Sequence, residues 1–241
     1  MPAKRVDRYC VVFDCESDTG VPNVAPQDRE MHIQRFMQFT VTCALKIPSE
    51  AILEQRSQDD IIAASTPMHW WRDVAVGNAK GNPIEDLLTL FDDADVIVGF
   101  NCLQFDFPLL YRFYKMSQRS SETPLQRYMN HRAKCLDIML RLRDATGSYV
   151  KLDTVLKGNG LPTKSGSGKD AVRLWADGER EKLLDYCKTD VEVTARLALT
   201  ETLRLHDVNI PHHVHGLRCA MASRYAVRMK RKCEEEEFVI V

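Results

Sequence analysis

The stretch YCVVFDCES, residues 9–17, joins a run of strand-forming apolar residues to two carboxylates. Short apolar runs that are rich in β-branched and aromatic residues and stop abruptly at polar residues are typical of buried strands. Side chains alternate along an extended strand, so Asp14 and Glu16 point to the same side. The sequence therefore predicts a strand that delivers a pair of carboxylates to its C-terminal edge.

Two more strands are expected close to this one. Residues 32–47, HIQRFMQFTVTCALKI, alternate well enough for one long strand, and residues 67–76, PMHWWRDVAV, are interpreted as a third. Together the three predict a β-meander. Alternation in the third strand turns one of Trp70 and Trp71 inward and leaves the other ring available to stack on a base.

Helices and strands alternate after the meander. A helix that begins near Pro83 carries an apolar stripe, and it leads into a buried strand at residues 95–99. A second helix over residues 106–116 and a short strand at residues 134–138 follow. This order predicts an α/β fold with a central mixed sheet of five strands flanked by helices.

The C-terminal half begins with a glycine-rich segment, KGNGLPTKSGSGKD, at residues 157–170. It is expected to form a loop, either an ordinary surface loop or a basic edge that steers a phosphate backbone. A long helix is expected to follow and to close the main domain, residues 1–203. Residues 204–241 are then expected to form a C-terminal helical extension with a charged tail.

Composition limits the classes of function. The 241 residues include 33 Lys and Arg against 34 Asp and Glu, a formal net charge of -1. Proteins that bind duplex nucleic acid through phosphate contacts usually carry a basic excess, so phosphate chemistry here must depend on local charge. The eight cysteines never form a Cys-x-x-Cys pair, which favours reduced core residues and no disulfide-linked partner. With no apolar run near the roughly 18 residues of a membrane helix and a polar start, we expect an intracellular protein, cytoplasmic or nuclear.

Three further side chains are candidates for a site with the first two carboxylates. Asp106 begins a helix just past a buried strand, so it faces the same crevice as Asp14 if the two strands are neighbours. Tyr186 and Asp190 lie four residues apart and share one helix face. A buried aspartate is costly unless it is paired or metal-bound. The alternatives are a helix-dipole charge for Asp106 and core packing for Tyr186.

Taken together, these side chains fit a two-metal site for phosphodiester hydrolysis. Carboxylate oxygens are the ligands that Mg²⁺ or Mn²⁺ prefer, and several carboxylates are needed to offset the charge of two cations. Two such ions can activate a water molecule and stabilise the leaving oxygen. A nearby tyrosine hydroxyl can orient the attacking water.

Three motifs in order, FDCES, NCLQFDFPLL and YCKTD, resemble the exonuclease motifs of the DEDD superfamily, in its DEDDy subgroup. Residues 156–197 look most like stand-alone relatives of the proofreading domain of family B DNA polymerases. The resemblance covers about residues 7–203. It implies a ribonuclease H-like fold and metal-dependent 3′-to-5′ removal of nucleoside monophosphates with two ions, Mg²⁺ or Mn²⁺.

The resemblance also implies roles at the metal site. Asp14, Glu16 and Asp190 are implied as direct ligands of the catalytic metal. Asp14 is also implied to bridge to the second ion. Asp106 is implied to support that second ion through water, and Tyr186 to orient the nucleophilic water.

Substrate contacts form a second group of expectations. The resemblance implies that Ser17 lies beside the terminal nucleotide and that Asn101 and Phe105 contact and pack against the strand. Lys164 and Lys169 of the glycine-rich segment are interpreted as backbone-steering cations. All five are expected to bind substrate rather than to react.

Other motifs fit the sequence less well. An EF-hand beginning at Asp14 fails because Thr19 and Ala25 occupy its glycine and final glutamate positions. A Walker A loop at residues 166–169 lacks its first glycine and the Mg²⁺-binding hydroxyl. A zinc site at residues 212–219 lacks a second cysteine pair at finger spacing.

The sequence favours a 3′-to-5′ exonuclease that acts on single-stranded DNA or frayed 3′ ends. An RNA exonuclease is the first alternative, because the same motifs serve RNA trimming. The second is an accessory nuclease subunit that acts mainly through protein partners. At 241 residues the chain has no room for a polymerase domain, so recruitment to a replication or repair assembly through residues 204–241 is expected in that case.

Overall fold

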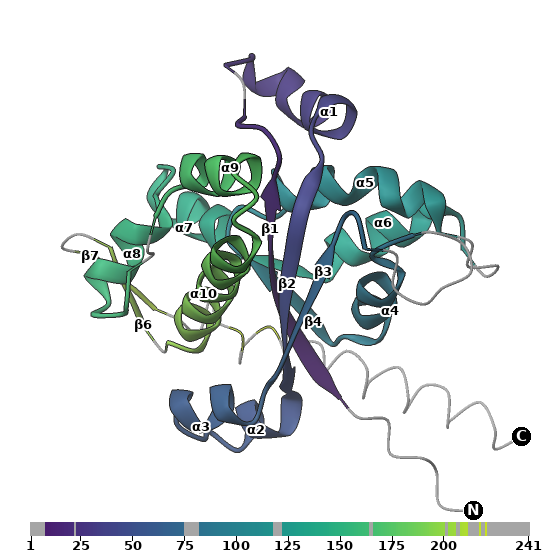
Figure 1. Cartoon of the computed structure of the whole chain (residues 1–241). Coiled ribbons are helices and arrows are strands. Elements are labelled where there is room, and N and C mark those ends of the chain that lie inside the picture. Colours follow the sequence, from purple (N-terminus) through teal and green to yellow (C-terminus); the bar gives the residue numbers. More distant parts are fainter. Residues whose placement is uncertain are drawn as a thin grey trace, which may run out of the picture.

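A five-stranded sheet with the strand order β3-β2-β1-β4-β5 forms the centre of the protein (Figure 1). The computed structural model describes residues 8–21, 23–74, 82–117, 122–163, 166–200, 202–205, 208–211, 217 and 220. The strands are β1 Tyr9–Ser17, β2 Phe39–Pro48, β3 Thr66–Trp71, β4 Val96–Gly99 and β5 Cys135–Asp137. β1, β2 and β3 are antiparallel neighbours, whereas β4 and β5 run parallel to β1. The expected α/β class and mixed sheet are confirmed.

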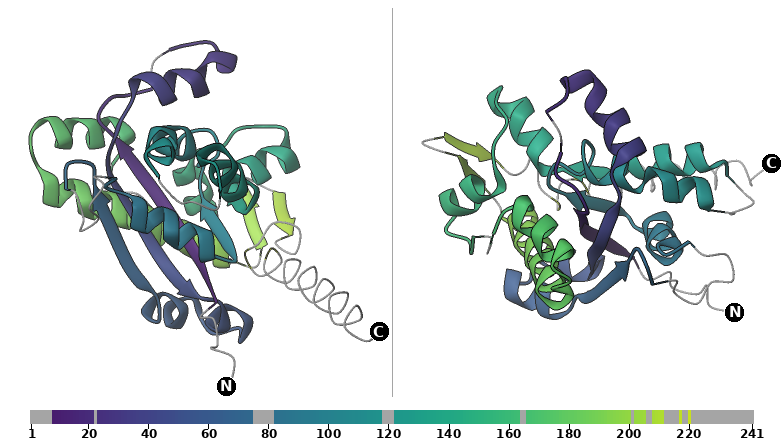
Figure 2. Two further views of the ribbon diagram at one scale, coloured as in Figure 1. Left: turned by 90° about the vertical axis from the view of Figure 1, so that its right-hand side faces the viewer. Right: turned by 45° about the horizontal axis from the view of Figure 1, so that its top comes forward.

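Helices flank the sheet on both faces. They are α1 Pro26–Phe36, α2 Ser49–Leu53, α3 Gln58–Ala63, α4 Glu85–Asp93, α5 Asp106–Met116, α6 Pro124–Ala133, α7 Ile138–Thr146, α8 Leu152–Gly158, α9 Gly168–Ala176 and α10 Arg180–Leu199. Figure 2 shows α9 and α10 on one side of the sheet and α5 and α6 on the other. None of the helices in the described part of the chain has the length and apolar character to cross a membrane.

β1 takes part in both hydrophobic cores. Val11 and Phe13 belong to the core that α4, α5 and α6 complete, and Cys10 and Val12 to the core that α8, α9 and α10 complete. Burial on both faces explains the continuous apolar run, since each large apolar side chain contributes roughly 1.5–3 kcal/mol when buried. Alternation continues past Val12, so it directs the next even-numbered side chains, Asp14 and Glu16, toward the face covered by α10.

The parallel pairs gather three strand ends at one edge of the sheet. Val12 pairs with Val98 across β1 and β4, and Gly99 pairs with Asp137 across β4 and β5. The carboxyl ends of these strands therefore lie side by side, which is where ligand sites occur in open α/β sheets. The carboxylates of β1, the loop after β4 and the end of β5 are thereby brought together.

The expectation of one strand over residues 32–47 is wrong for its first part. Residues 26–36 form α1, and β2 begins only at Phe39. Pro26 stands in the first turn, Asp28 adds acidity there, and Ile33 is buried on the inner face. Pro26 and Asp28 lie before residues 32–47, the segment whose alternation favoured a strand.

The third strand is shorter than expected. β3 ends at Trp71, and residues 75 and 76 lie outside the described residues. Trp70 is buried and Trp71 is half-buried, so one ring points inward as alternation predicts. The outer ring stacks on Trp175 of α9 with 6.4 Å between centroids. One of its faces is therefore already covered by protein.

The glycine-rich segment is only partly a loop. Residues 157 and 158 belong to α8, and α9 begins at Gly168. The reason is a capping box, in which Ser167 and Asp170 satisfy each other's backbone N–H groups at the start of α9.

The long C-terminal helix ends earlier than expected. α10 stops at Leu199, and β6 Thr202–Leu205 pairs antiparallel with β7 Val208–Pro211. The division of the chain after residue 203 stays a prediction, and that position lies inside this hairpin. Most of the residues considered for a zinc site, and most of those expected to form the helical extension and charged tail, lie outside the described residues.

Candidate active site

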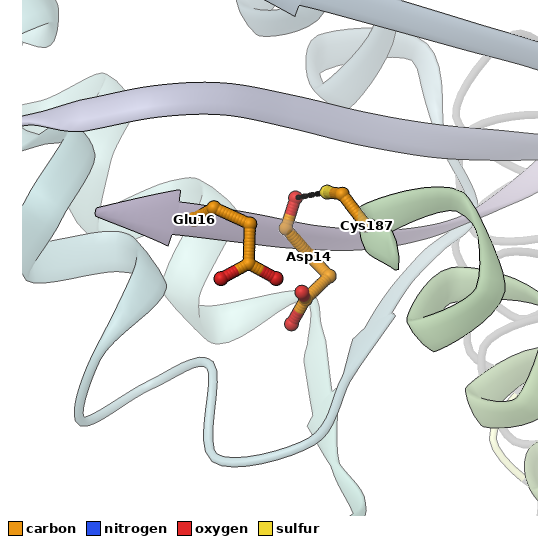
Figure 3. Close-up of side chains that lie close together, drawn as sticks. All are labelled: Asp14, Glu16 and Cys187. Atoms are coloured by element: carbon orange, nitrogen blue, oxygen red, sulfur yellow. Dashed lines mark hydrogen bonds between the residues drawn. The ribbon is translucent and has the colours of Figure 1, made fainter. Parts of the chain in front are cut away.

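Asp14 and Glu16 lie next to each other near the end of β1 (Figure 3). One carboxylate oxygen of each, together with the Cys187 sulfur, falls within a group whose atoms are at most 4.8 Å apart. Glu16 is buried and Asp14 is half-buried. Two carboxylates this close form the oxygen-rich, negatively charged donor set that a hard divalent cation prefers.

Cys187 contributes a thiol beside this pair but does not suit a role as ligand for such a cation. Its sulfur donates to the backbone oxygen of Asp14 at 3.6 Å, and Figure 3 shows that contact. Burial raises the pKa of the Cys187 thiol well above its ordinary value. Its hydrogen bond fixes α10 against the backbone of β1.

Asp106 is the first residue of α5 and is 2% exposed. Its Oδ1 accepts a hydrogen bond from the backbone N–H of Cys15 at 2.7 Å. Burial, and then the charge of Asp14, raise the pKa of Asp106 well above its ordinary value. The structure thus brings a third carboxylate to the end of β1, and a bound cation would relieve the repulsion among them.

Tyr186 and Asp190 come from α10 and are both buried, at 5% and 3% exposed. They stand one turn apart on the helix that Cys187 fixes to Asp14. α10 therefore carries both side chains to the face of the sheet toward which the carboxylates of β1 point.

Gly166 is a feature of the site that sequence reasoning missed. A Cβ atom at this position would stand 3.4 Å from Cε2 of Tyr186 and 3.2 Å from Oδ2 of Asp170. A side chain at this position would therefore contact the edge of the tyrosine ring, and glycine leaves that space open. The glycine-rich composition was visible in the sequence, but the place of Gly166 beside Tyr186 depends on how α9 and α10 pack.

Asp137 is a second residue that sequence reasoning missed. It is buried at the end of β5, where its two carboxylate oxygens accept from the backbone N–H groups of Asn101 at 3.0 Å and Leu103 at 2.9 Å. Burial raises its pKa, although these hydrogen bonds act in the opposite direction. Asp137 thereby shapes the loop after β4, in which Asn101 has a left-handed backbone with φ 66°. Its place at the end of an expected strand was the available signal.

The predicted substrate contacts fall in different places. Asn101 and Phe105 line a cavity of about 350 Å³, whereas Ser17 is buried in β1 and donates to the backbone oxygen of Thr19 at 2.8 Å. Lys169 is exposed on α9, and Lys164 lies outside the described residues. The structure therefore brings two of the five together.

Comparison with sequence families gives one match. Residues 80–202, about half of the chain, match a family described as predicted 3′-5′ exonucleases related to the exonuclease domain of PolB. The matched range includes Asp106, Tyr186 and Asp190, whereas Asp14 and Glu16 precede it. A comparison with curated proteins gave no match.

Solved structures give more distant similarities. A family B DNA polymerase from the archaeon Pyrobaculum calidifontis is 17% identical with a TM-score of 0.48, covering 79% of this chain and 24% of that one. Exonuclease I of E. coli, in complex with a dT13 oligonucleotide, is 12% identical with a TM-score of 0.47, covering 95% and 45%. Exonuclease I from Methylocaldum szegediense is 17% identical with a TM-score of 0.36, covering 80% and 40%. The chain spans less than half the length of each.

Proposed function

Because the chain belongs to the family of predicted 3′-5′ exonucleases related to the exonuclease domain of PolB, we propose that it shortens single-stranded DNA or frayed 3′ ends by a two-metal mechanism. The products are nucleoside monophosphates. The observation that carries this proposal is the meeting of carboxylates from β1 and α5 at one edge of the sheet. Such a concentration of negative charge needs cations before it can accept a phosphodiester.

The proposed cofactor is Mg²⁺ or Mn²⁺, held by carboxylate oxygens. Asp14, Glu16 and Asp190 would hold one ion, and Asp14 would also face a second ion that Asp106 holds through water. When bound, the ions would activate the attacking water and stabilise the leaving oxygen. The carboxylate oxygens of Asp14 and Glu16 support hard cations over soft ones, because hard divalent ions prefer oxygen ligands.

In this proposal Tyr186 orients the attacking water through its hydroxyl. Its ring is buried, and Gly166 leaves the space beside one edge of it free of a side chain. A buried ring has little freedom to swing, so its hydroxyl keeps one direction. Holding the attacking water in the reactive orientation accounts for a large part of the rate of hydrolysis.

Substrate binding is assigned to the residues around the metal site. Ser17, Asn101 and Phe105 would hold the last nucleotides of the strand, with Lys164 and Lys169 drawing its backbone toward the site. The cavity beside Asn101 and Phe105 supports this assignment, because it offers amide groups and an aromatic ring together.

The test is degradation of a 5′-labelled single-stranded DNA oligonucleotide with Mn²⁺. A descending ladder is expected, and EDTA should prevent it. Asp14→Ala and Asp190→Ala should abolish it, whereas Glu181→Ala, an exposed acid on the same helix as Asp190, should not. Unchanged degradation by the first two variants would sink the proposal, and degradation of RNA alone would replace its substrate.

A further inference from the structure

The cavity of about 350 Å³ has a second wall that the predicted substrate contacts do not explain. Its lining residues are Val21, Asn23, Arg29, Asn101, Gln104 and Phe105. The first three follow β1 and the last three follow β4, so both walls extend from the sheet edge that carries the carboxylates. The volume falls within the roughly 300–1,000 Å³ of small-molecule sites.

Arg29 supplies the positive charge of this wall. It is exposed on α1, and within the described part of the chain no carboxylate pairs with it. Several other arginines do pair with carboxylates, for example Arg72 with Asp18 and Arg196 with Asp59, each at 2.7 Å. An unpaired guanidinium beside a cavity that holds amides and an aromatic ring is available to an anionic ligand.

Tyr149 continues the same surface beyond the cavity. Its side chain belongs to the large exposed apolar groups, at 61% exposed. Its hydroxyl nevertheless accepts hydrogen bonds from Gln104 at 3.3 Å and from Arg143 at 3.1 Å. The Arg143 guanidinium also lies over the ring, 5.4 Å from its centroid. The ring is therefore held in place while staying exposed, which lowers the entropic cost of stacking a base on it.

Gln104 connects the two features, because it lines the cavity and also donates to Tyr149. We propose that Arg29 and Tyr149 form a strand-holding subsite for single-stranded DNA upstream of the 3′ end. Arg29 binds a backbone phosphate and Tyr149 stacks on a base. This inference rests on the proposed exonuclease function.

The phosphate contact is tested by fluorescence anisotropy of labelled dT8 in EDTA, with wild type and Arg29→Ala compared over a range of salt concentrations. Removing one phosphate contact on a single strand should lower the slope of log K against log salt by about 0.7. Arg35→Ala is the matched control, because Arg35 is also exposed on α1 but does not line the cavity. If Arg29→Ala has the same salt slope and the same Kd as wild type, the proposed phosphate contact of Arg29 is wrong.

The stacking contact is tested in the same assay with Tyr149→Ala and Tyr149→Phe. Loss of the ring should raise Kd for dT8 by roughly 5- to 150-fold, the range for one stacked base, and should leave the salt slope unchanged. The phenylalanine keeps the ring and should stay within about 3-fold of wild type. Equal loss in both variants would show that the hydroxyl, not the ring, holds the strand.

Two further arms separate this inference from the function on which it rests. If wild type degrades DNA and Arg29→Ala and Tyr149→Ala bind dT8 as wild type does, the subsite is wrong and the exonuclease stands. If wild type binds dT8 without degrading it in Mn²⁺, while the variants bind weakly, the subsite stands and the exonuclease does not. Binding of U8 but not dT8 would overturn the assignment to DNA.

Discussion

The carboxylate of Asp106 accepts a hydrogen bond from the backbone N–H of Cys15, 2.7 Å away and 91 residues earlier in the chain. Cys15 stands between the two carboxylates of β1. The bond therefore fixes the start of α5 against the strand that carries Asp14 and Glu16. Asp106 thus supplies both a structural hydrogen bond and a negative charge, and a substitution can remove the charge while keeping the hydrogen bond.

Asp106→Asn is expected to fold normally and to lose activity. The amide oxygen can still accept from Cys15, but the charge that would support the second ion is gone. Loss of an outer-shell partner typically costs about 10- to 100-fold in activity or metal affinity. Steady-state degradation rates and Mn²⁺ titration check this, with circular dichroism as the control for folding. Wild-type rates would remove Asp106 from the mechanism.

Gly166→Ala is expected to lower kcat with little change in metal affinity. The new methyl group would stand 3.2 Å from the Asp170 carboxylate, which must give by a few tenths of an ångström, and would touch the Tyr186 ring at 3.4 Å. Small displacements of a positioning group can cost up to about 100-fold. Tyr186→Phe removes the hydroxyl altogether, so its loss of kcat is the largest that displacement of Tyr186 can cause.

Gly168→Ala is the matched control for that experiment. A Cβ atom at Gly168 meets nothing within 4 Å, and the residue is the first of α9. The substitution should leave kcat unchanged and stabilise the protein by about 0.4–1 kcal/mol. Equal losses of kcat at both glycines would mean that loop flexibility, not contact with Tyr186, sets the rate.

The parts of the site that could be predicted from the sequence are those whose positions depend on one strand or on neighbouring strands. Asp14 and Glu16 could be assigned because alternation along one strand fixes their common direction. Asp106 needed only the neighbouring placement of β1 and β4, which the topology supplies. The contact of Gly166 with Tyr186 depends on the packing of two helices, which no local pattern encodes.

The errors in the fold have a similar origin. Strand β1 was predictable because its continuous apolar run stops at Asp14, and helix α5 because its apolar residues recur at helical spacing after Asp106. Helix α1 was mistaken because its last five residues, 32–36, directly precede the alternating residues of β2, while Pro26, the decisive start signal, lies before them. The end of α10 was placed too late because Thr202–Leu205 continues an apolar pattern that a hairpin with β7 also satisfies.

Asn101 should respond differently to glycine and to alanine. Its φ of 66° is tolerated by glycine but costs alanine roughly 1–2 kcal/mol. Asn101→Ala should therefore lower the free energy of unfolding, measured in urea, more than Asn101→Gly does. If the side chain holds substrate, both should raise KM for single-stranded DNA to a similar degree. A raised KM in the alanine variant alone would assign the effect to the backbone of the loop.

The acid sensitivity of the protein should depend on Asp92. Burial raises the pKa of this carboxyl, but hydrogen bonds from His131 and Arg127 outweigh it and bring the pKa to about 2. A carboxyl whose pKa is lower in the folded protein than in the unfolded chain stabilises fully above the unfolded value. This contribution, about 2 kcal/mol, should be lost as pH falls from about 4 to 2.

Asp92→Asn tests this by urea unfolding at pH 7 and at pH 2.5. At pH 7 the variant should lose about 3 kcal/mol, because Arg127, whose side chain is 2% exposed, loses a paired charge. The difference from wild type should shrink at pH 2.5, where wild-type Asp92 begins to be protonated. Asp59→Asn, which breaks an exposed pair with Arg196, should cost less than about 1 kcal/mol at either pH. A difference for Asp92→Asn that stays constant with pH would mean that shape rather than charge is what Asp92 supplies.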